Sequence, residues 1–288
     1  MEQLRNTGSR PNVIQIVPPR HCYQLTALTA DRDVDVELAT GPLRSPTGPN
    51  GAEGFRNKAG SQIAVPHVTN IYMGAFWGDR THLEGFTKAV LENGYLDPLK
   101  RLGYGTGSGR YLGPLDATPI GQRTIHDREI QNILAKMLDG GALQADASTL
   151  FMLLLPKGVI VQLDSDNKKS CASFCGYHES FVYKGLDVPY GVMPSSVGCN
   201  SCADGDMGYF TAAYVHELVE ACTDKIPGDG WVSATGQESA DLEAWQHFGW
   251  GPPDDPKRYV VQGYYTNEEG NTIGTWRDSA PAEGVAVA

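Results

Sequence analysis

The apolar positions of this chain recur with a helical period in two well-separated segments. A stripe of apolar residues at helical spacing runs from Leu83 to Leu91, and Thr81 with Glu84 has the pattern of a capping box at its start. Residues 127–139 show the same spacing and are followed by Gly140-Gly141, so an amphipathic helix is predicted there.

Short runs of β-branched, aromatic and other apolar residues predict β-strands. They lie at residues 13–17, 67–74, 150–155 and 159–163. Residues 180–193 predict a hairpin with Lys184-Gly185 at its tip. A short helix is expected at residues 96–102, and the glycine-rich residues 103–113 after it are interpreted as a loop. Strands and helices mixed in this order are typical of an α+β fold in which a small mixed sheet packs on helices.

Residues 209–224 also have the length of a helix, but apolar side chains lie on almost every side of it, so most of it should be buried. The run His216-Glu217-Leu218-Val219-Glu220 is at its centre. Residues four apart share one helix face, so His216 and Glu220 can hold one divalent cation between them. Buried charges need a partner or a metal, which favours this interpretation over a chance run of polar residues on a solvated face.

The better-known H-E-x-x-H motif binds zinc through two histidines and uses the intervening Glu as the general base of a metalloprotease. Glu217 is therefore the candidate catalytic base. A carboxylate in place of the second histidine makes the ligand set harder, so Zn²⁺ is expected, with Fe²⁺ or Mn²⁺ as alternatives. Glu238 is the expected third ligand and Asp241 the next candidate, one of the two orienting the other or His216. The alternative for both carboxylates is a solvated turn.

His178 is the second candidate catalytic residue, as an oxyanion donor or a fourth metal ligand. A structural histidine in the hairpin is the alternative. Tyr177 and Tyr190 are weaker candidates for the same donor role. The remaining histidines considered show no metal-type spacing and are expected to be structural or exposed: His67, His82, His126 and His247.

Length and charge limit the possible functions. The 288 residues fit one large domain, and we expect a poorly defined N-terminal segment at residues 1–60 followed by a single domain at residues 61–288. The net charge of −11 argues against nucleic-acid partners, which need a basic face, and against anionic membranes. No apolar run reaches the length of a transmembrane helix. A peptide or a small molecule is the expected substrate, and the oligomeric state is not readable from the sequence.

Six cysteines allow two interpretations. Four of them lie within residues 171–202 with the spacings Cys171-x3-Cys175 and Cys199-x2-Cys202, which fit either two disulfides or a structural zinc site. Cys222 falls inside the apolar helix and is expected to be a buried free thiol.

A series of short motifs follows in order along most of the chain. The motifs are Val68-Thr-Asn-Ile-Tyr-Met-Gly74, Phe76-Trp-Gly78, Tyr95-Leu-Asp-Pro-Leu99, Leu102-Gly-Tyr-Gly105, Leu153-Leu-Leu-Pro-Lys-Gly-Val159, Phe174-Cys-Gly-Tyr-His178, Val188-Pro-Tyr-Gly-Val192, His216-Glu-Leu-Val-Glu-Ala-Cys-Thr-Asp224, Gly228-Asp-Gly-Trp231 and Glu238-Ser-Ala-Asp241. Together they resemble the plant EXORDIUM / phosphate-induced protein family and its bacterial and fungal relatives, over about residues 65–280.

The resemblance implies a zincin-like metal site and favours disulfides over a cysteine zinc site, because that family is largely exported. The family motif reads His-Glu-x-x-Glu-Ala-x-Thr-Asp-Pro, then Gly-Trp, then Glu-Ile-Gly-Asp. Here Lys225 replaces the proline and Ser239-Ala240 replaces Ile-Gly, which leaves every candidate ligand in place. Glu243 occupies the position of a family cysteine, so one family disulfide is in doubt.

Three functions are consistent with these residues. The first is a zinc-dependent hydrolase of the metallopeptidase kind, and the second is a metalloenzyme of another class, such as a biosynthetic tailoring enzyme that uses iron or manganese. The third is a binding or signalling protein in which the metal is a structural staple. An extracellular location is expected from the resemblance. The first residues lack the basic-then-apolar pattern of a signal peptide, so either a leader has been removed or export uses another route. A cytoplasmic location stays open.

Overall fold

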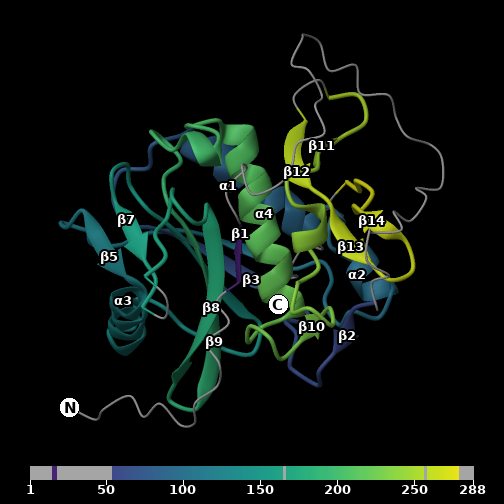
Figure 1. Ribbon diagram of the computed structural model, residues 1–288, viewed down its shortest axis with the longest axis horizontal. Helices are drawn as coiled ribbons and strands as arrows, with labels where there is room; N and C mark the ends of the chain where they lie inside the picture. The colour runs from purple at the N-terminus through teal and green to yellow at the C-terminus, as the bar shows by residue number, and fades with distance from the viewer. Residues whose placement is uncertain (1–14, 18–53, 165–166, 256–257, 279–288) are drawn as a thin grey trace, which may run out of the picture.

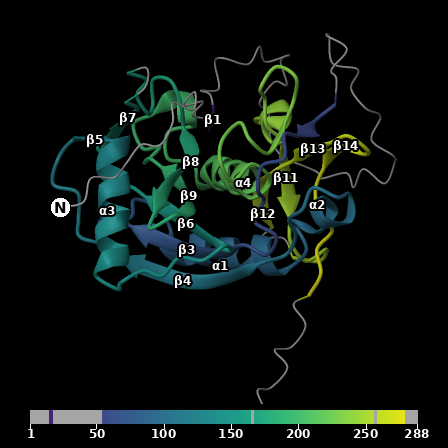
Figure 2. The ribbon, with the colours of Figure 1, turned by 90° about the horizontal axis from the view of Figure 1, so that it is seen from below.

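The computed structural model describes residues 15–17, 54–164, 167–255 and 258–278. They form a mixed α+β fold in which a six-stranded sheet lies between helices (Figure 1, Figure 2). The strands of the sheet, in spatial order, are β1 (Gln15–Val17), β8 (Gly176–Tyr183), β9 (Leu186–Met193), β6 (Thr149–Leu154), β3 (His67–Tyr72) and β4 (Arg110–Asp116). Strand β8 is antiparallel to β1 and β9, and the other neighbours pair in parallel. The α+β class with a mixed sheet is therefore confirmed.

The remaining elements are short ladders and helices. Two-stranded ladders pair β2 (Arg56–Asn57) with β10 (Trp231–Val232), β5 (Thr124–His126) with β7 (Ile160–Gln162), β11 (His247–Trp250) with β12 (Tyr259–Gln262), and β13 (Tyr264–Thr266) with β14 (Gly270–Thr272). The α-helices of the described residues are α1 (Arg80–Glu92), α2 (Asp97–Arg101), α3 (Asp127–Asp139) and α4 (Met207–Thr223). Two 3₁₀ turns, η2 (Asn200–Cys202) and η3 (Asp241–Glu243), flank α4 in sequence.

The sheet is covered on both faces. Along β6 the side chains of Leu150, Met152 and Leu154 enter the core shared with α1 and α4, whereas Phe151 and Leu153 enter the core shared with α3. Alternate side chains of a strand point to opposite faces, and a strand covered on both sides is apolar throughout. This arrangement explains the unbroken apolar run of β6, and it places α4 on the face of the sheet opposite α3 (Figure 2).

The predicted start of the first helix is wrong by two residues. Asp79, and not Thr81, caps α1, and its carboxylate accepts a hydrogen bond from the backbone N–H of His82 at 3.0 Å. Aspartate is as good an N-cap as threonine, so the local pattern alone did not separate the two positions. Helix α3 spans the predicted residues 127–139.

The predicted hairpin is confirmed, although it begins at Gly176 and not at Ser180. Strands β8 and β9 pair antiparallel, and Tyr183 lies opposite Leu186 at the closed end. Lys184 and Gly185 both have positive φ angles, 49° and 85°, which is the backbone that a two-residue type I′ turn requires.

The segments interpreted as loop or given no predicted structure contain eight of the strands, namely β2, β4, β5 and β10 to β14. Strand β4 begins at Arg110, inside the glycine-rich stretch, and it is an edge strand that carries Gly113 and Pro114. Glycine and proline are tolerated at an edge, but they conceal the strand pattern. Strands β11 to β14 occupy residues 247–272, for which no strand was predicted. Of these, β12 packs along α4.

Two disulfides connect the segment before β8 with the segment before α4. Cys171 bonds Cys199, and Cys175 bonds Cys202, so the disulfide interpretation is confirmed and the cysteine zinc site is wrong. Cys222 is a free, buried thiol, as predicted, and burial raises its pKa to about 12. Disulfides are typical of proteins that fold in an oxidising compartment.

Candidate metal centre

Helix α4 carries its charged residues inside the protein. Asp206 caps it by accepting a hydrogen bond from the backbone N–H of Tyr209 at 3.0 Å. From Phe210 to Thr223 every residue of the helix is buried, because the sheet packs on one side and β12 on another. The predicted helix at residues 209–224 is therefore confirmed within two residues at each end, and its polar residues are held away from solvent.

The first group of donor atoms lies between α4 and the start of η3. The Nε2 atom of His216 is 3.1 Å from Oε1 of Glu220, one helical turn away, and 3.9 Å from Oδ1 of Asp241. Donor atoms around a tetrahedral zinc ion lie about 3.3 Å from one another, given zinc–ligand bonds of about 2.0 to 2.1 Å. The distance from His216 to Glu220 is close to that value and the distance to Asp241 is longer. The three side chains form a group that could hold a metal ion.

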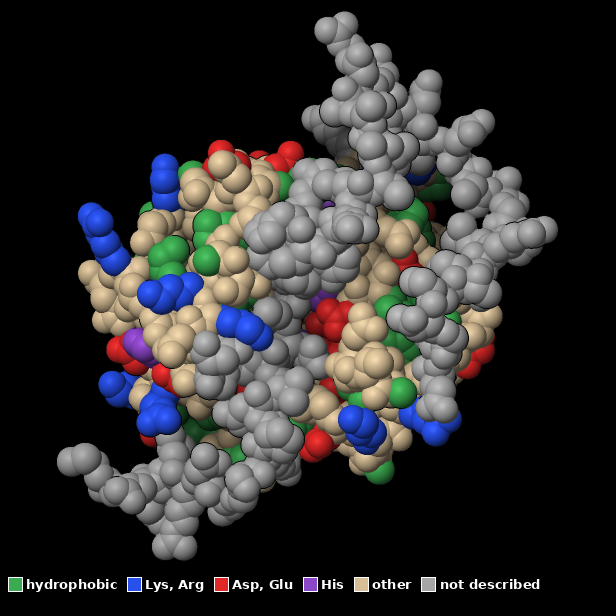
Figure 3. Space-filling model, in the orientation of Figure 1, with side chains coloured by type: hydrophobic (Ala, Val, Ile, Leu, Met, Phe, Trp, Pro, Cys, Tyr) green, Lys and Arg blue, Asp and Glu red, His purple; other side chains and the backbone are tan. Residues whose placement is uncertain are grey.

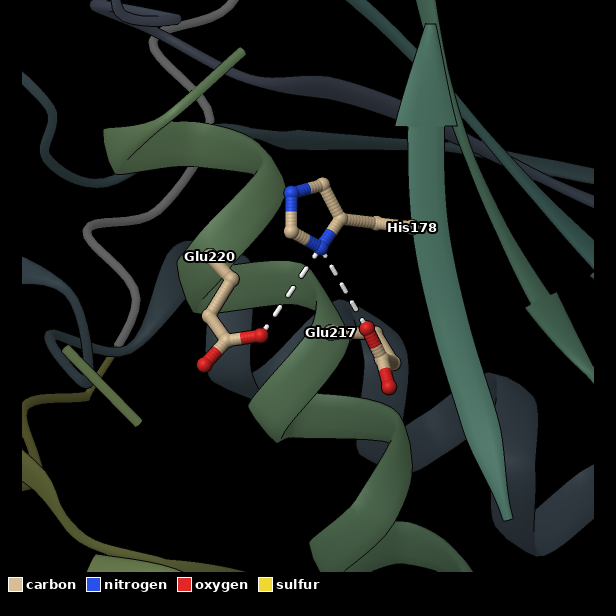
Figure 4. Close-up of side chains that lie close together, drawn as sticks. All are labelled: His178, Glu217 and Glu220. Atoms are coloured by element: carbon tan, nitrogen blue, oxygen red, sulfur yellow. Dashed lines mark hydrogen bonds and ion pairs between the residues drawn. The ribbon is translucent and has the colours of Figure 1, made fainter. Parts of the chain in front are cut away.

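A second group forms where β8 passes over α4. His178 projects from β8 so that its Nδ1 atom is 3.4 Å from Oε2 of Glu217 and 3.7 Å from Oε2 of Glu220 (Figure 4). All three side chains are fully buried, and they too could hold a metal ion. Glu220 therefore belongs to both groups, with one carboxylate oxygen facing each histidine.

A glycine in β8 allows α4 to come this close. A β-carbon placed on Gly176 would lie 3.1 Å from Oε1 of Glu217 and 3.0 Å from Sδ of Met193, closer than ordinary van der Waals contact. Any larger residue at this position would displace the carboxylate of Glu217.

The loop after α4 supplies the other two carboxylates. The carboxylate of Asp224 accepts hydrogen bonds from the backbone N–H groups of Gly228, Asp229 and Gly230, which fixes the turn that leads the chain back over the helix. Asp241 in turn accepts from the backbone N–H of Glu238 at 2.9 Å.

These contacts direct the two acidic side chains to different histidines. Asp241 faces His216, as described above, and Oε1 of Glu238 lies 3.4 Å from Nε2 of His178. Asp241, which was the second choice for the third ligand, thus belongs to a group that could hold a metal. Glu238 lies on the far side of the His178 ring from Glu217 and Glu220.

Gln262 of β12 lies behind His216. Its Nε2 atom donates to the backbone oxygen of Ala240 at 2.9 Å, and its Oε1 atom accepts from the backbone N–H of Trp245 at 3.1 Å. Those two backbone contacts assign the orientation of the amide, so Nε2 is also the atom that faces Nδ1 of His216, at 2.8 Å. In this arrangement Nδ1 accepts from Gln262 and the ring proton lies on Nε2. A cation on Nε2 would move that proton to Nδ1, and Gln262 would then have to give up its contacts with Ala240 and Trp245.

Several polar atoms in this cluster make no hydrogen bond of ordinary geometry with any described residue, although they are completely buried. They are Nε2 of His178, Nε2 of His216, both carboxylate oxygens of Glu220 and both of Glu238. These side chains face one another at 3.1 to 3.7 Å, and the backbone N–H groups of Ala240 and Asp241 approach Glu220. An unsatisfied buried polar atom costs about 1 to 3 kcal/mol, and more if it is charged. So many of them together fit a centre that is completed by a cation.

Burial and mutual repulsion shift the pKa values of the carboxyl groups upwards. Burial raises the pKa of Glu220 to about 8, and burial together with Glu220 raises that of Asp241 to about 7. The pKa values of Glu217 and Glu238 are also raised, again mainly by burial. Burial alone would lower the pKa of His178, but the Glu238 and Glu217 carboxylates outweigh it and raise that pKa. Without a cation these acids tend to keep their protons.

The structure brings together every residue that the sequence singled out for the site. His178, His216, Glu217, Glu220, Glu238 and Asp241 form one buried cluster. Gln262 was missed because it lies in a segment with no recognised pattern.

The weaker candidates lie elsewhere. The donor role suggested for Tyr177 and Tyr190 is wrong, because both hydroxyls point to the other face of the sheet and donate to Asp127. The candidate metal groups among the described residues do not include the other four histidines considered.

Comparison of the chain with models of protein families, with curated proteins and with solved structures gave no match. Within the described residues, no helix is both long and apolar enough to cross a membrane. On the face shown in Figure 3, Lys and Arg side chains are interspersed with Asp and Glu.

Proposed function

We propose that this protein is a zincin-like, metal-dependent hydrolase that cleaves peptide or amide bonds, with zinc as the expected metal. The observation that carries this proposal is the buried set of unsatisfied donor atoms on α4 and the two elements that face it. Buried polar atoms in proteins are nearly always satisfied, and a cation would satisfy several of these at once.

The chain's own residues divide the work as follows. His216, Glu220 and Asp241 would hold the ion, and Glu238 would orient His178. A bound zinc ion lowers the pKa of an attacking water and polarises the scissile carbonyl. Glu217 would be the base that takes a proton from an attacking water and returns it to the leaving amine. His178, which is protonated readily, would donate to the developing oxyanion.

The edge of the sheet supports a peptide as substrate. Strand β1 pairs antiparallel with β8, with Gln15 opposite His178 and Ile16 opposite Tyr177, and β1 also lies against α4. The outer edge of β8 therefore binds an extended backbone directly beside the candidate centre. A substrate peptide would use the same backbone hydrogen bonds, and β1 would have to give way to it.

A structural metal is the second candidate function. It is favoured by the burial of the site, because the side chains of His178, Glu217, Glu220 and Glu238 are fully buried. Asp241 is partly exposed, with 12% of its side-chain surface accessible to solvent. In this case the metal would stabilise a binding or signalling protein. The hard ligand set also suits Fe²⁺ or Mn²⁺, and metal analysis of the purified protein would identify the ion.

Location follows from the disulfides and the resemblance. We propose that the protein works outside the cell or in another oxidising compartment, since Cys171–Cys199 and Cys175–Cys202 would be reduced in a typical cytosol. The likeness to the EXORDIUM / phosphate-induced protein family agrees with export.

The test compares peptide hydrolysis by the zinc-loaded wild type with that by Glu217→Gln and by a matched control, Glu179→Gln. Glu179 is the next residue along β8 and belongs to neither metal group. We expect Glu217→Gln to lose about 10²- to 10⁴-fold in rate with an unchanged circular dichroism spectrum, and Glu179→Gln to stay near wild type. If no peptide library is cleaved and chelation only lowers the melting temperature, the structural-metal candidate is correct.

A further inference from the structure

The carboxylate of Glu220 is shared between the two groups of donor atoms in a specific way. Its Oε1 atom is 3.1 Å from Nε2 of His216, and its Oε2 atom is 3.7 Å from Nδ1 of His178. The backbone N–H groups of Ala240 and Asp241 approach this carboxylate, but neither oxygen makes a hydrogen bond of ordinary geometry to a described residue. The two oxygens of one carboxylate thus face two different histidines, each of which has a further carboxylate of its own nearby.

We infer that the centre holds two divalent cations bridged by Glu220. The first ion would bind His216, Glu220 and Asp241, and the second would bind His178, Glu220 and Glu217. Each ion then has one imidazole, one carboxylate of its own and one oxygen of the bridge. Ions in two-metal sites lie about 3.5 to 4 Å apart, a separation that a bridging carboxylate can span. This inference rests on the proposed function, since it concerns the same cluster.

His178 has the surroundings of a metal ligand. Glu238 lies 3.4 Å from its Nε2 atom and favours a proton on that nitrogen, which leaves the lone pair of Nδ1 directed to Glu217 and Glu220 (Figure 4). A carboxylate behind a histidine is the usual device that fixes the tautomer of a metal ligand.

The charges of the cluster also fit two ions better than one. Four carboxylates, those of Glu217, Glu220, Glu238 and Asp241, accompany two histidines. One divalent cation offsets two of these four negative charges, and a second offsets the other two. In a buried site, uncompensated charge is costly, so a two-ion centre is the arrangement in which all four carboxylates can be ionised.

Glu217 has a role in both proposals, as the general base of the hydrolase and as a ligand of the second ion. As a ligand it holds the second ion through one oxygen, and as a base it acts on the water beside it. The number of bound ions separates these roles, because a residue that is only a base does not change the metal content when it is replaced.

The experiment measures metal content of the full chain after saturation with Zn²⁺ and removal of free metal. We expect two ions per chain in the wild type, one in Glu217→Gln and one in Asp241→Asn. The control Glu179→Gln should keep two. In Glu238→Gln, binding of the second ion should weaken about 10- to 100-fold. Mn²⁺-loaded protein should show the paramagnetic resonance spectrum of two coupled ions.

Each other outcome decides against the second ion. One ion in the wild type overturns the two-ion centre but leaves the proposed hydrolase intact, and no ion overturns both. Two ions that persist in Glu217→Gln place the second ion elsewhere and overturn the assignment. Circular dichroism of each variant confirms that a lower metal content does not reflect unfolding.

Discussion

At the scale of single residues, the candidate centre depends on glycines that leave room for charged side chains. Gly176 is the clearest case, because α4 approaches β8 there and no β-carbon separates the strand from Glu217. Met193 and Gly191 line the same contact between sheet and helix, where the nearest atom to an added β-carbon on Gly191 is Sδ of Met152, at 2.6 Å. The polar cluster therefore lies where the sheet and α4 approach each other closely.

Gly176→Ala should displace the Glu217 carboxylate and weaken metal binding on the His178 side. Met193 is flexible and can adapt, so we expect a loss of about 1 to 3 kcal/mol in stability, the usual cost of overpacking, and at least about tenfold weaker binding of the metal. Isothermal titration with Zn²⁺ checks this. Gly121→Ala, at a position without a positive φ angle where nothing lies within 4 Å, controls for the general effect of losing a glycine. Wild-type affinity in Gly176→Ala would show that the close approach is not needed.

At the scale of elements, three segments far apart in sequence meet on α4. Strand β8 brings His178, the turn held by Asp224 brings Glu238 and Asp241, and β12 brings Gln262. The disulfides tie the segment before β8 to the segment before α4, so the strand and the helix that carry the centre start from a common anchor. The outer edge of β8 is the part of this assembly that another chain segment can use.

If a substrate peptide pairs with β8, strand β1 competes with it. In an antiparallel pair of strands, every second residue exchanges both backbone hydrogen bonds with the residue opposite. Either Gln15 or Ile16 is such a residue, so the double variant Gln15→Pro, Ile16→Pro removes its N–H donor. We expect peptide hydrolysis to rise severalfold, mainly through a lower KM. The measurement is steady-state hydrolysis of a fluorogenic peptide beside wild type, and a fall in activity would show that β1 completes the site and does not obstruct it.

At the scale of the whole molecule, the chain places a concentration of acid in its interior. The net charge of −11 is partly internal, because Glu217, Glu220 and Glu238 are completely buried. The folded protein therefore contains buried carboxylates whose negative charge must be neutralised by protons or cations. This property links the stability of the protein to both pH and metal.

Removal of the metal should reverse the pH dependence of stability. The folded pKa values of Glu220, about 8, and Asp241, about 7, lie above their ordinary values of 4.5 and 3.8. A group whose pKa is raised by folding contributes stability that is present below its unfolded pKa and is lost as the pH rises through its folded pKa. The metal-free protein should thus lose at least about 5 °C in melting temperature between pH 5 and pH 8.

The metal-loaded protein should behave in the opposite way, because a cation binds the deprotonated ligands more tightly as the pH rises. Thermal unfolding at pH 5 and pH 8, with and without chelator, tests both statements. The replacement Glu220→Gln should flatten the metal-free profile. A metal-free protein that becomes more stable towards pH 8 would contradict this account of the cluster.

Much of this protein can be derived from its sequence, and the reasons are local. The spacing of His216 and Glu220 is set by the helix that holds them, the apolar flanks of that helix require burial, and the extents of α3 and the β8–β9 hairpin follow from periodicity and turn residues. Each of these depends on interactions between near neighbours, which a sequence displays directly.

Other features depend on which segments come together, and the tertiary structure alone decides them. That His178 reaches the same helix face, that Asp241 rather than Glu238 lies beside His216, and that Gln262 stands behind that histidine all result from long-range packing. The strands at residues 247–272 escaped prediction for the same reason, since short strands owe their stability to α4 and to one another. No local sequence pattern encodes distances across the core. The positions of the two histidines around the Glu220 carboxylate depend on such distances.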